Sequence, residues 1–384
     1  MNSIRKPKAK KVILVSMGIV LAVVVSIVSI VYIILRHYIR KMNLVDVDRN
    51  REYDYAYAED IQEYIIDDTD DGFAVTDADT DEDGLATDHS NTDNISMGND
   101  DTDFINFPDY YKDISNIPII DDKNVFNILL IGSDTRDPDA RGRSDAMMLL
   151  SINKKKKSII LTSLLRDIYL NIPGKKSNRL NAAYAIGGAK LLMETIEYNF
   201  RIKVDNYVSV DFFAFLEIID AIGGVTVEVT EKELPLLNKH IRSMNLKLNE
   251  EADKDVLSAP GKHLLNGKQT LGYCRIRYIG TDFARTARQR KVMEQIFEKM
   301  KKAGLLNIID ILNTVLPKVT TNLKEREIIS HIINLPDYLR YEFIQCRIPI
   351  DGSYENKRIR GMDVLVIDFD KNIKEISQKI YMTE

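Results

Sequence analysis

A run of 24 residues without a charge, residues 12–35 (VILVSMGIVLAVVVSIVSIVYIIL), constrains this chain more than any other feature. About 20 apolar residues suffice for a helix to cross a bilayer. A cleavable signal peptide would have a shorter apolar core and a small-residue cleavage site, whereas Arg36 and His37 follow this run directly. A helix buried in a soluble core is the alternative, but this run is apolar on every face. The sequence therefore predicts a transmembrane helix at residues 12–35.

Charges on the two sides of this run predict its orientation. Five basic residues precede it and three follow it closely. The larger basic group marks the cytoplasmic side, so residues 1–11 are expected to be a cytoplasmic tail and everything after residue 35 to lie outside. The chain is thus predicted to be a single-pass cell-membrane protein with its folded domain extracytoplasmic. A tail of 11 residues is too short for a DNA-binding domain, and no nucleic-acid partner is expected.

An acidic segment follows the apolar run. Residues 46–103 hold 21 Asp and Glu against two Arg, and few aliphatic residues. Such a segment cannot bury enough apolar surface to offset chain entropy, so residues 36–119 are predicted to be a disordered linker. Asp79, Asp81, Asp83 and Gly84 match the start of a calcium loop, but its twelfth position is Ser90 rather than a carboxylate. A solvated spacer is the favoured interpretation, with calcium binding as the alternative.

The remaining part, residues 120–384, is expected to be one folded α/β domain. Short apolar segments typical of buried strands (NVFNILLIG, DAMMLLSIN, SIILTSLLRD, NYVSVDF and VTVEV) alternate with helical patterns at 189–200 and 212–222. YCRIRY is predicted to be another strand, and Asp282 to cap a long helix over 283–302. This alternation predicts a central sheet covered on both faces. Cys274 and Cys346 are interpreted as buried free thiols in separate strands, with a disulfide left open.

Two arginine patterns point to an anionic ligand. In a strand YCRIRY, Arg275 and Arg277 would share one face about 7 Å apart, a spacing that suits two adjacent phosphates. The alternative is a charged strand face turned to solvent. The apolar stripe of the long helix, traced back to its first turns, reaches Gln289 and Arg285. A helix N-terminus already attracts anions, so an inward Arg285 predicts an anion there, unless it pairs with Asp282.

Further charged residues follow the predicted strands. Asp134 follows the first strand, Arg143 and Asp145 enter the second, and Arg166 and Asp167 end the third. Two carboxylates beside an anion would repel it unless a cation bridges them, and magnesium, with its preference for carboxylate and phosphate oxygens, fits this role. The alternative is that Asp134 and Asp145 only form ion pairs with neighbouring arginines.

At these residues the chain resembles the LytR–CpsA–Psr family of cell-wall glycopolymer ligases, over about residues 124–379. The resemblance implies an α/β/α sandwich with a central mixed sheet and an apolar tunnel for a polyprenyl tail. The helices 190–200 and 212–222 are expected to line this tunnel; burial of the second on two sides is the alternative. Eight motifs in family order carry the resemblance: NILLIGSDTR, GRSDAMMLLSIN, SLLRDIYLNIPG, RLNAAYAIGGAKLL, VSVDFFAF, DAIGGVTVEV, GKHLLNGKQTLGYCRIR and DFARTARQRKV.

The resemblance also implies an activity and its residues. Members are proposed to move a phospho-glycopolymer (teichoic acid, capsule or another anionic wall polymer) from a polyprenyl-pyrophosphate carrier to a peptidoglycan hydroxyl. Asp145 or Asp167 is the expected general base, and Asp134 and Asp145 are the expected ligands of Mg²⁺ or Mn²⁺. The implied catalytic residues are Asp134, Arg143, Asp145, Arg166 and Asp167. The implied pyrophosphate-binding residues are Arg143, Arg166, Arg275, Arg277, Arg285 and Gln289.

Two other functions compete with this interpretation. One is a non-catalytic membrane protein that binds polyprenyl pyrophosphate and regulates envelope maintenance. The other is a calcium-dependent surface adhesion protein, which would depend on the acidic linker. The Arg and Asp clusters favour a transferase over an adhesion protein. Turnover of a labelled lipid-linked polymer separates a transferase from a binder.

Overall fold

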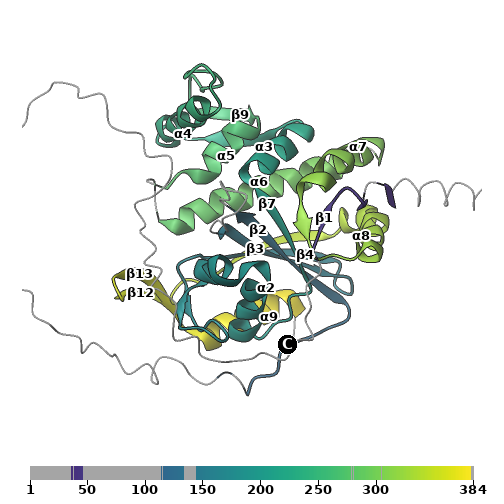
Figure 1. Ribbon diagram of the computed structural model, residues 1–384, viewed down its shortest axis with the longest axis vertical. Coiled ribbons are helices and arrows are strands. Elements are labelled where there is room, and N and C mark those ends of the chain that lie inside the picture. Colours follow the sequence, from purple (N-terminus) through teal and green to yellow (C-terminus); the bar gives the residue numbers. More distant parts are fainter. Residues whose placement is uncertain are drawn as a thin grey trace, which may run out of the picture.

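A mixed seven-stranded sheet forms the centre of the protein (Figure 1). The computed structural model describes residues 36–37, 39–45, 114, 116–133, 144–277, 279, 281–303 and 305–381. The predicted membrane span, nearly all of the acidic linker, Asp134 and Arg143 lie outside these residues. The strand order is β1 (Asn43–Leu44), β10 (Thr320–Thr321), β7 (Asn206–Asp211), β2 (Val125–Ser133), β3 (Ser144–Asn153), β4 (Ser158–Leu164) and β11 (Glu342–Ile348). Adjacent strands pair both parallel and antiparallel, so the predicted mixed sheet is confirmed.

Helices cover both faces of this sheet. On the lower side in Figure 1, α2 (Leu180–Phe200) and α9 (Phe369–Tyr381) pack against the largest hydrophobic core. On the upper side lie α3 (Phe212–Ala221), α4 (Glu233–Lys247), α5 (Gly267–Arg275) and α6 (Asp282–Lys302). Because both faces of the sheet are covered, β4 is buried along its whole length, and residues 128–131 of β2 form a continuous apolar run.

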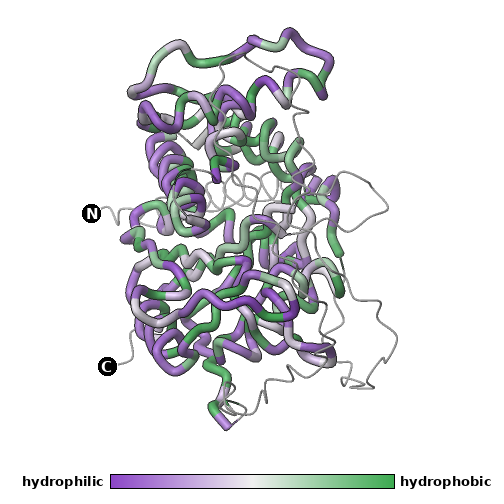
Figure 2. The backbone as a smooth tube through the Cα atoms, turned by 90° about the vertical axis from the view of Figure 1, so that its left-hand side faces the viewer, coloured by the Kyte–Doolittle hydropathy of each residue, from purple (hydrophilic) through white to green (hydrophobic). Residues whose placement is uncertain are grey.

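Smaller elements complete the fold. The pairs β5 (Tyr169–Leu170) with β6 (Asn178–Arg179), β8 (Val225–Val229) with β9 (Gly261–Leu265), and β12 (Tyr354–Ile359) with β13 (Met362–Ile367) are all antiparallel. The remaining helices are α7 (Leu305–Val315), the 3-10 turn η2 (Leu316–Lys318) and α8 (Glu325–Tyr338). Helical segments of the tube in Figure 2 change from purple to green within single turns, as amphipathic helices on a core do.

The predicted strand YCRIRY is wrong, because Tyr273–Arg275 form the last turn of α5. This helix starts at a capping box in which the Asn266 side chain accepts from the backbone N–H of Gln269 and Gln269 returns the bond. Its first residue, Gly267, abuts α3 so closely that a Cβ there would lie 2.2 Å from the Leu216 carbonyl oxygen. Helix initiation and this close contact override the alternating pattern of the six residues.

The predicted cap of α6 is also corrected. Thr281 occupies the N-cap position, and Asp282 is the first helical residue, where its carboxylate forms an ion pair with Arg285. Neither cysteine of the described part forms a disulfide; Cys274 is buried on α5 rather than on a strand, and Cys346 is on β11. Among the described residues, no helix combines the length and the apolar character needed to span a bilayer.

Candidate functional site

A cavity of about 800 Å³ lies between the upper face of the sheet and α3, α5 and α6. The alternation of the strands decides which side chains line it. Leu129 belongs to the core below the sheet, whereas the next residue, Leu130, turns up into the cavity. Apolar side chains from all its walls line much of it, among them Met148, Val208, Phe215, Ile218, Met293 and Ile296.

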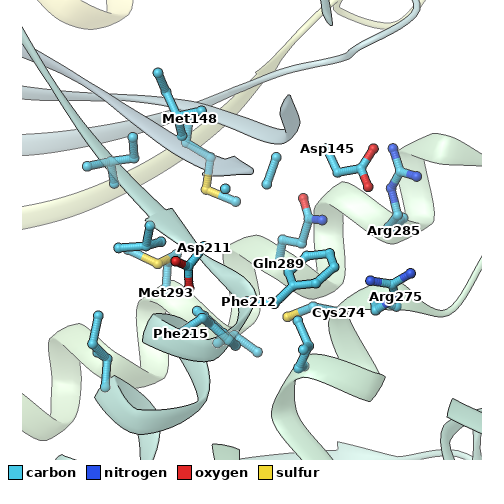
Figure 3. A pocket seen from close by; sticks show the side chains of 18 of the residues that line it. Asp145, Met148, Asp211, Phe212, Phe215, Cys274, Arg275, Arg285, Gln289 and Met293 are labelled. Carbon is cyan, nitrogen blue, oxygen red and sulfur yellow. The ribbon is translucent and has the colours of Figure 1, made fainter. Parts of the chain in front are cut away.

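One end of the cavity is charged (Figure 3). Asp145 reaches it from β3, Arg275 and Arg277 from the end of α5, and Arg285 and Gln289 from the first turns of α6. In Figure 3 the side chains of Asp145 and Arg285 lie close together, and Gln289 lies below them. The predicted inward face of α6 is thereby confirmed for Arg285, Gln289, Val292, Met293 and Ile296, which line the cavity, whereas Phe297 stacks on Phe343 instead. The cavity therefore has an apolar body and a polar end.

Arg285 is the most deeply buried arginine of the cavity wall. Its side chain is 3% exposed and forms an ion pair with Asp282. Its Nε and Nη1 atoms are buried and donate to no acceptor among the described residues. Burial lowers the pKa of Arg285, although Asp282 opposes this shift. A buried guanidinium with unused donors at a cavity wall is the arrangement expected of an anion site.

Asp145 is the carboxylate on the cavity wall beside these arginines. Burial would raise its pKa, but nearby guanidinium groups, Arg285 first, hold the pKa of Asp145 below its ordinary value. Its Oδ1 lies 3.4 Å from Nη1 of Arg166 and 3.9 Å from Nη2 of Arg277. Asp145 is therefore ionised at neutral pH, and the ion pair with Arg166 that the sequence left as an alternative is present.

The pKa of Asp167 is shifted in the opposite direction to that of Asp145. It lies behind the cavity wall, with Oδ2 3.5 Å from Nε of Arg166 and Oδ1 3.6 Å from Nη1 of Arg179. Burial raises the pKa of Asp167 and the negative charge of Asp282 adds to this, so the arginines do not fully compensate. Two carboxylates of one site with pKa values shifted in opposite directions are a pattern of acid–base catalysis.

Arg275 approaches the cavity by a different contact. Its guanidinium carbon lies 4.6 Å from the centre of the Phe212 ring at the start of α3, a cation–π geometry. Five arginines thus gather around three carboxylates, which leaves two positive charges in excess within the described residues. We call these five the arginine cluster: Arg166, Arg179, Arg275, Arg277 and Arg285.

The structure brings together every predicted site residue that it describes. Asp145, Arg166, Asp167, Arg275, Arg277, Arg285 and Gln289 meet at or behind one end of one cavity. Asp134 and Arg143 lie outside the described residues. Sequence reasoning missed Arg179, which is 1% exposed and pairs with Asp167. Its position at the start of RLNAAYAIGG was the available signal.

The prediction for the apolar walls was half right. Helix α3 lines the cavity through Phe212, Phe215 and Ile218. The helix predicted at 190–200 does not, because α2 buries Leu192 and Phe200 in the core below the sheet. Both helices have similar apolar patterns, and the side on which each packs depends on the topology of the sheet.

A divalent metal has one evident ligand among the described residues. Asp145 is ionised and faces the cavity, so its oxygens suit Mg²⁺ or Mn²⁺. No group of three or more metal-ligating side chains occurs in the described part of the chain. A metal site built on Asp145 would therefore depend on the phosphate oxygens of a ligand and on Asp134.

The domain thus combines a mixed sheet, helices on both faces, and an apolar cavity with a cationic end. The LytR_cpsA_psr family model matches residues 86–379, and the chain belongs to this family. The family resemblance seen in the sequence is thus confirmed.

Individual relatives support this assignment. The chain is 34% identical over 237 residues to Biofilm regulatory protein A of Streptococcus mutans, covering 58% of this chain and 55% of that protein. It is 36% identical over 211 residues to the polyisoprenyl-teichoic acid–peptidoglycan teichoic acid transferase TagU of Enterococcus faecalis, covering 53% and 62%. The matches thus span less than two thirds of these two relatives. B. subtilis TagT with bound octaprenyl pyrophosphate lipid has a TM-score of 0.51 at 25% identity, over 70% of this chain and 94% of that one.

Proposed function

We propose that this protein transfers a phospho-glycopolymer from a polyprenyl-pyrophosphate carrier to a hydroxyl of peptidoglycan. The observation that carries the proposal is the cavity itself, which joins an apolar body to a cationic end. A polyprenyl tail suits the body and a pyrophosphate suits the arginine cluster. The names of TagU and of lipid-bound TagT describe this substrate class for two relatives. We further propose that residues 12–35 anchor the protein in the cell membrane with the domain outside.

The proposed reaction needs alignment and charge neutralisation more than covalent chemistry. The acceptor oxygen attacks the phosphorus that carries the glycopolymer, the bond from this phosphorus to the bridging oxygen breaks, and polyprenyl phosphate leaves. Arg275, Arg277 and Arg285 neutralise the negative charge on the phosphate oxygens. Asp167, with its raised pKa, takes the proton of the acceptor hydroxyl. Asp145 stays ionised and holds Arg166 and Arg277 in place.

A divalent cation is part of this proposal. Asp145 and Asp134 would hold Mg²⁺ or Mn²⁺, which would supply positive charge to the pyrophosphate during transfer. Treatment with EDTA is expected to abolish transfer, and added Mg²⁺ to restore it. Activity that persists unchanged after thorough chelation would show that Asp145 serves only its ion pairs.

The cavity is expected to select for chain length. Each buried CH₂ contributes about 0.8 kcal/mol, so affinity for polyprenyl pyrophosphates should rise with tail length until the cavity is full. Phe215→Trp adds bulk to the wall and should reduce this gain for long tails. Phe213→Trp is the matched control, because Phe213 is on the same helix but is 59% exposed and not part of the wall. Equal affinity of the wild type for short and long tails would contradict a lipid-binding cavity.

Turnover tests the proposed function directly. Purified full-length protein with a labelled lipid-linked glycopolymer and peptidoglycan should yield labelled peptidoglycan and polyprenyl phosphate. The second candidate is a non-catalytic binder with a regulatory role, favoured by the name of the Streptococcus mutans relative. Tight lipid binding without any product would establish that alternative.

A further inference from the structure

Two arginines outside the cavity, Arg290 on α6 and Arg347 on β11, belong to the contact between these two elements. Residues 283, 290 and 297 follow one another at intervals of seven on this helix and share a face. Phe283 contacts the guanidinium of Arg347 on β11, 4.4 Å from its ring centre, and Phe297 stacks on Phe343 at 4.8 Å. Arg290, midway between them, therefore faces β11 as well. Neither Arg290 nor Arg347 lines the cavity.

Both guanidinium groups can take a ligand anion. Nη1 of Arg290 is buried and donates to no acceptor among the described residues. Burial and the positive charge of Arg347 lower the pKa of Arg290, so the two charges repel each other. Arg347 donates to the Pro349 carbonyl at 3.1 Å and pairs with Asp351, whose side chain is 88% exposed. An exposed pair contributes little, so Arg347 can exchange Asp351 for another carboxylate at small cost.

The strand register places this pair beside the proposed general base. Arg347 is paired with Ser163, and the next residue, Ile348, accepts a bond from the Leu165 N–H at 3.0 Å. Arg166 and Asp167 follow Leu165 directly in the chain. Arg347 therefore lies at the strand end from which Asp167 emerges.

We propose that Arg290 and Arg347 form a second anion subsite, which binds a carboxylate of the peptidoglycan acceptor. This inference rests on the proposed transfer reaction. In such a reaction the attacking and leaving oxygens lie roughly in line on opposite sides of the phosphorus. The leaving polyprenyl phosphate occupies the cavity, so the acceptor must approach from the other side. Arg290 and Arg347 lie outside the cavity, and Arg347 lies at the strand end from which Asp167 emerges.

Steady-state kinetics of the full-length protein with varied acceptor and donor tests this subsite. Arg347→Gln and Arg290→Gln should each raise the KM for peptidoglycan fragments roughly tenfold or more, through loss of a charge-assisted bond, and leave the KM for the lipid donor unchanged. Arg358→Gln, which removes the same charge from an exposed position on β12, should change neither. Peptidoglycan fragments with amidated carboxylates should bind the wild type as weakly as fragments with free carboxylates bind Arg347→Gln. Amidation should not weaken binding to Arg347→Gln any further.

Several outcomes overturn the subsite. An acceptor KM unchanged in both glutamine variants excludes it, and a rise in the donor KM instead would assign the pair to a phosphate of the donor. If the wild type transfers nothing, the proposed function fails, and calorimetric binding of free and amidated fragments decides the inference separately. Equal affinity for the two fragments excludes the subsite. Arg347→Gln loses the hydrogen bond to the Pro349 carbonyl and could have a lower melting temperature for that reason alone. Arg290→Gln then still tests the subsite, because Nη1 of Arg290 has no acceptor among the described residues to lose.

Discussion

Replacing Asp167 by asparagine is expected to lower the rate of glycopolymer transfer by about 10²- to 10⁴-fold, the range typical for a lost general base. A base must be ionised to accept a proton, so the wild-type rate should rise with pH through the pKa of Asp167. Because burial and Asp282 raise this pKa, that rise should lie above the range of an ordinary aspartate. A pH–rate profile measured at saturating donor reports its position.

Melting temperatures provide the control for Asp167. A carboxyl whose pKa is raised by folding destabilises the protein once pH exceeds that pKa, so Asp167→Asn should melt at the same temperature as the wild type or higher at neutral pH. The pKa of Asp145 is shifted in the opposite direction, so its effect on stability has the opposite sign. Its lowered pKa contributes stability above the ordinary aspartate pKa that is lost as pH falls, so Asp145→Asn should melt lower at neutral pH. Normal transfer by a folded Asp167→Asn protein would exclude Asp167 as the base.

Replacing Arg285 by glutamine is expected to weaken binding of polyprenyl pyrophosphate by roughly ten- to hundredfold, the effect of losing a charge-assisted hydrogen bond. The transfer rate should fall at least as far, because more charge develops in the transition state. The free protein should keep its melting temperature or gain slightly. Burial disfavours the charge of Arg285, and two of its donors have no acceptor within the described residues.

Arg288 is the matched control for Arg285, because it is buried on the same helix, one turn further on. Its Nη1 lies 3.2 Å from Glu233 and its Nη2 donates to the Ile276 carbonyl at 2.5 Å, so it joins α6 to α4 and to the end of α5. Arg288→Gln should therefore lower the melting temperature and leave the lipid-induced increase in melting temperature close to that of the wild type. If Arg285→Gln instead has a lower melting temperature and keeps the full lipid-induced increase in melting temperature, Arg285 serves only a structural ion pair and the pyrophosphate binds elsewhere.

The sequence by itself determined the central strands and the inward face of α6. Continuous apolar runs such as residues 128–131 of β2 and 159–161 of β4 are stable only when both faces are covered, so burial follows from composition. On α6, Arg285 and Gln289 continue an apolar stripe at helical spacing, and the period of the helix fixes which way they point. Both features depend on residues close together in the chain, and both were predicted.

Only the tertiary structure decided the local form of residues 273–277 and the electrostatics of the two aspartates. YCRIRY is too short to prefer a strand over a helix, and the cap at Asn266 with the packing of Gly267 against α3 made its first three residues the end of a helix. Asp145 and Asp167 look alike in the sequence. Burial raises the pKa of both carboxyl groups. Around Asp145 the arginines that folding collects, Arg285 foremost, outweigh burial and lower the pKa, whereas around Asp167 burial and the negative charge of Asp282 outweigh the arginines.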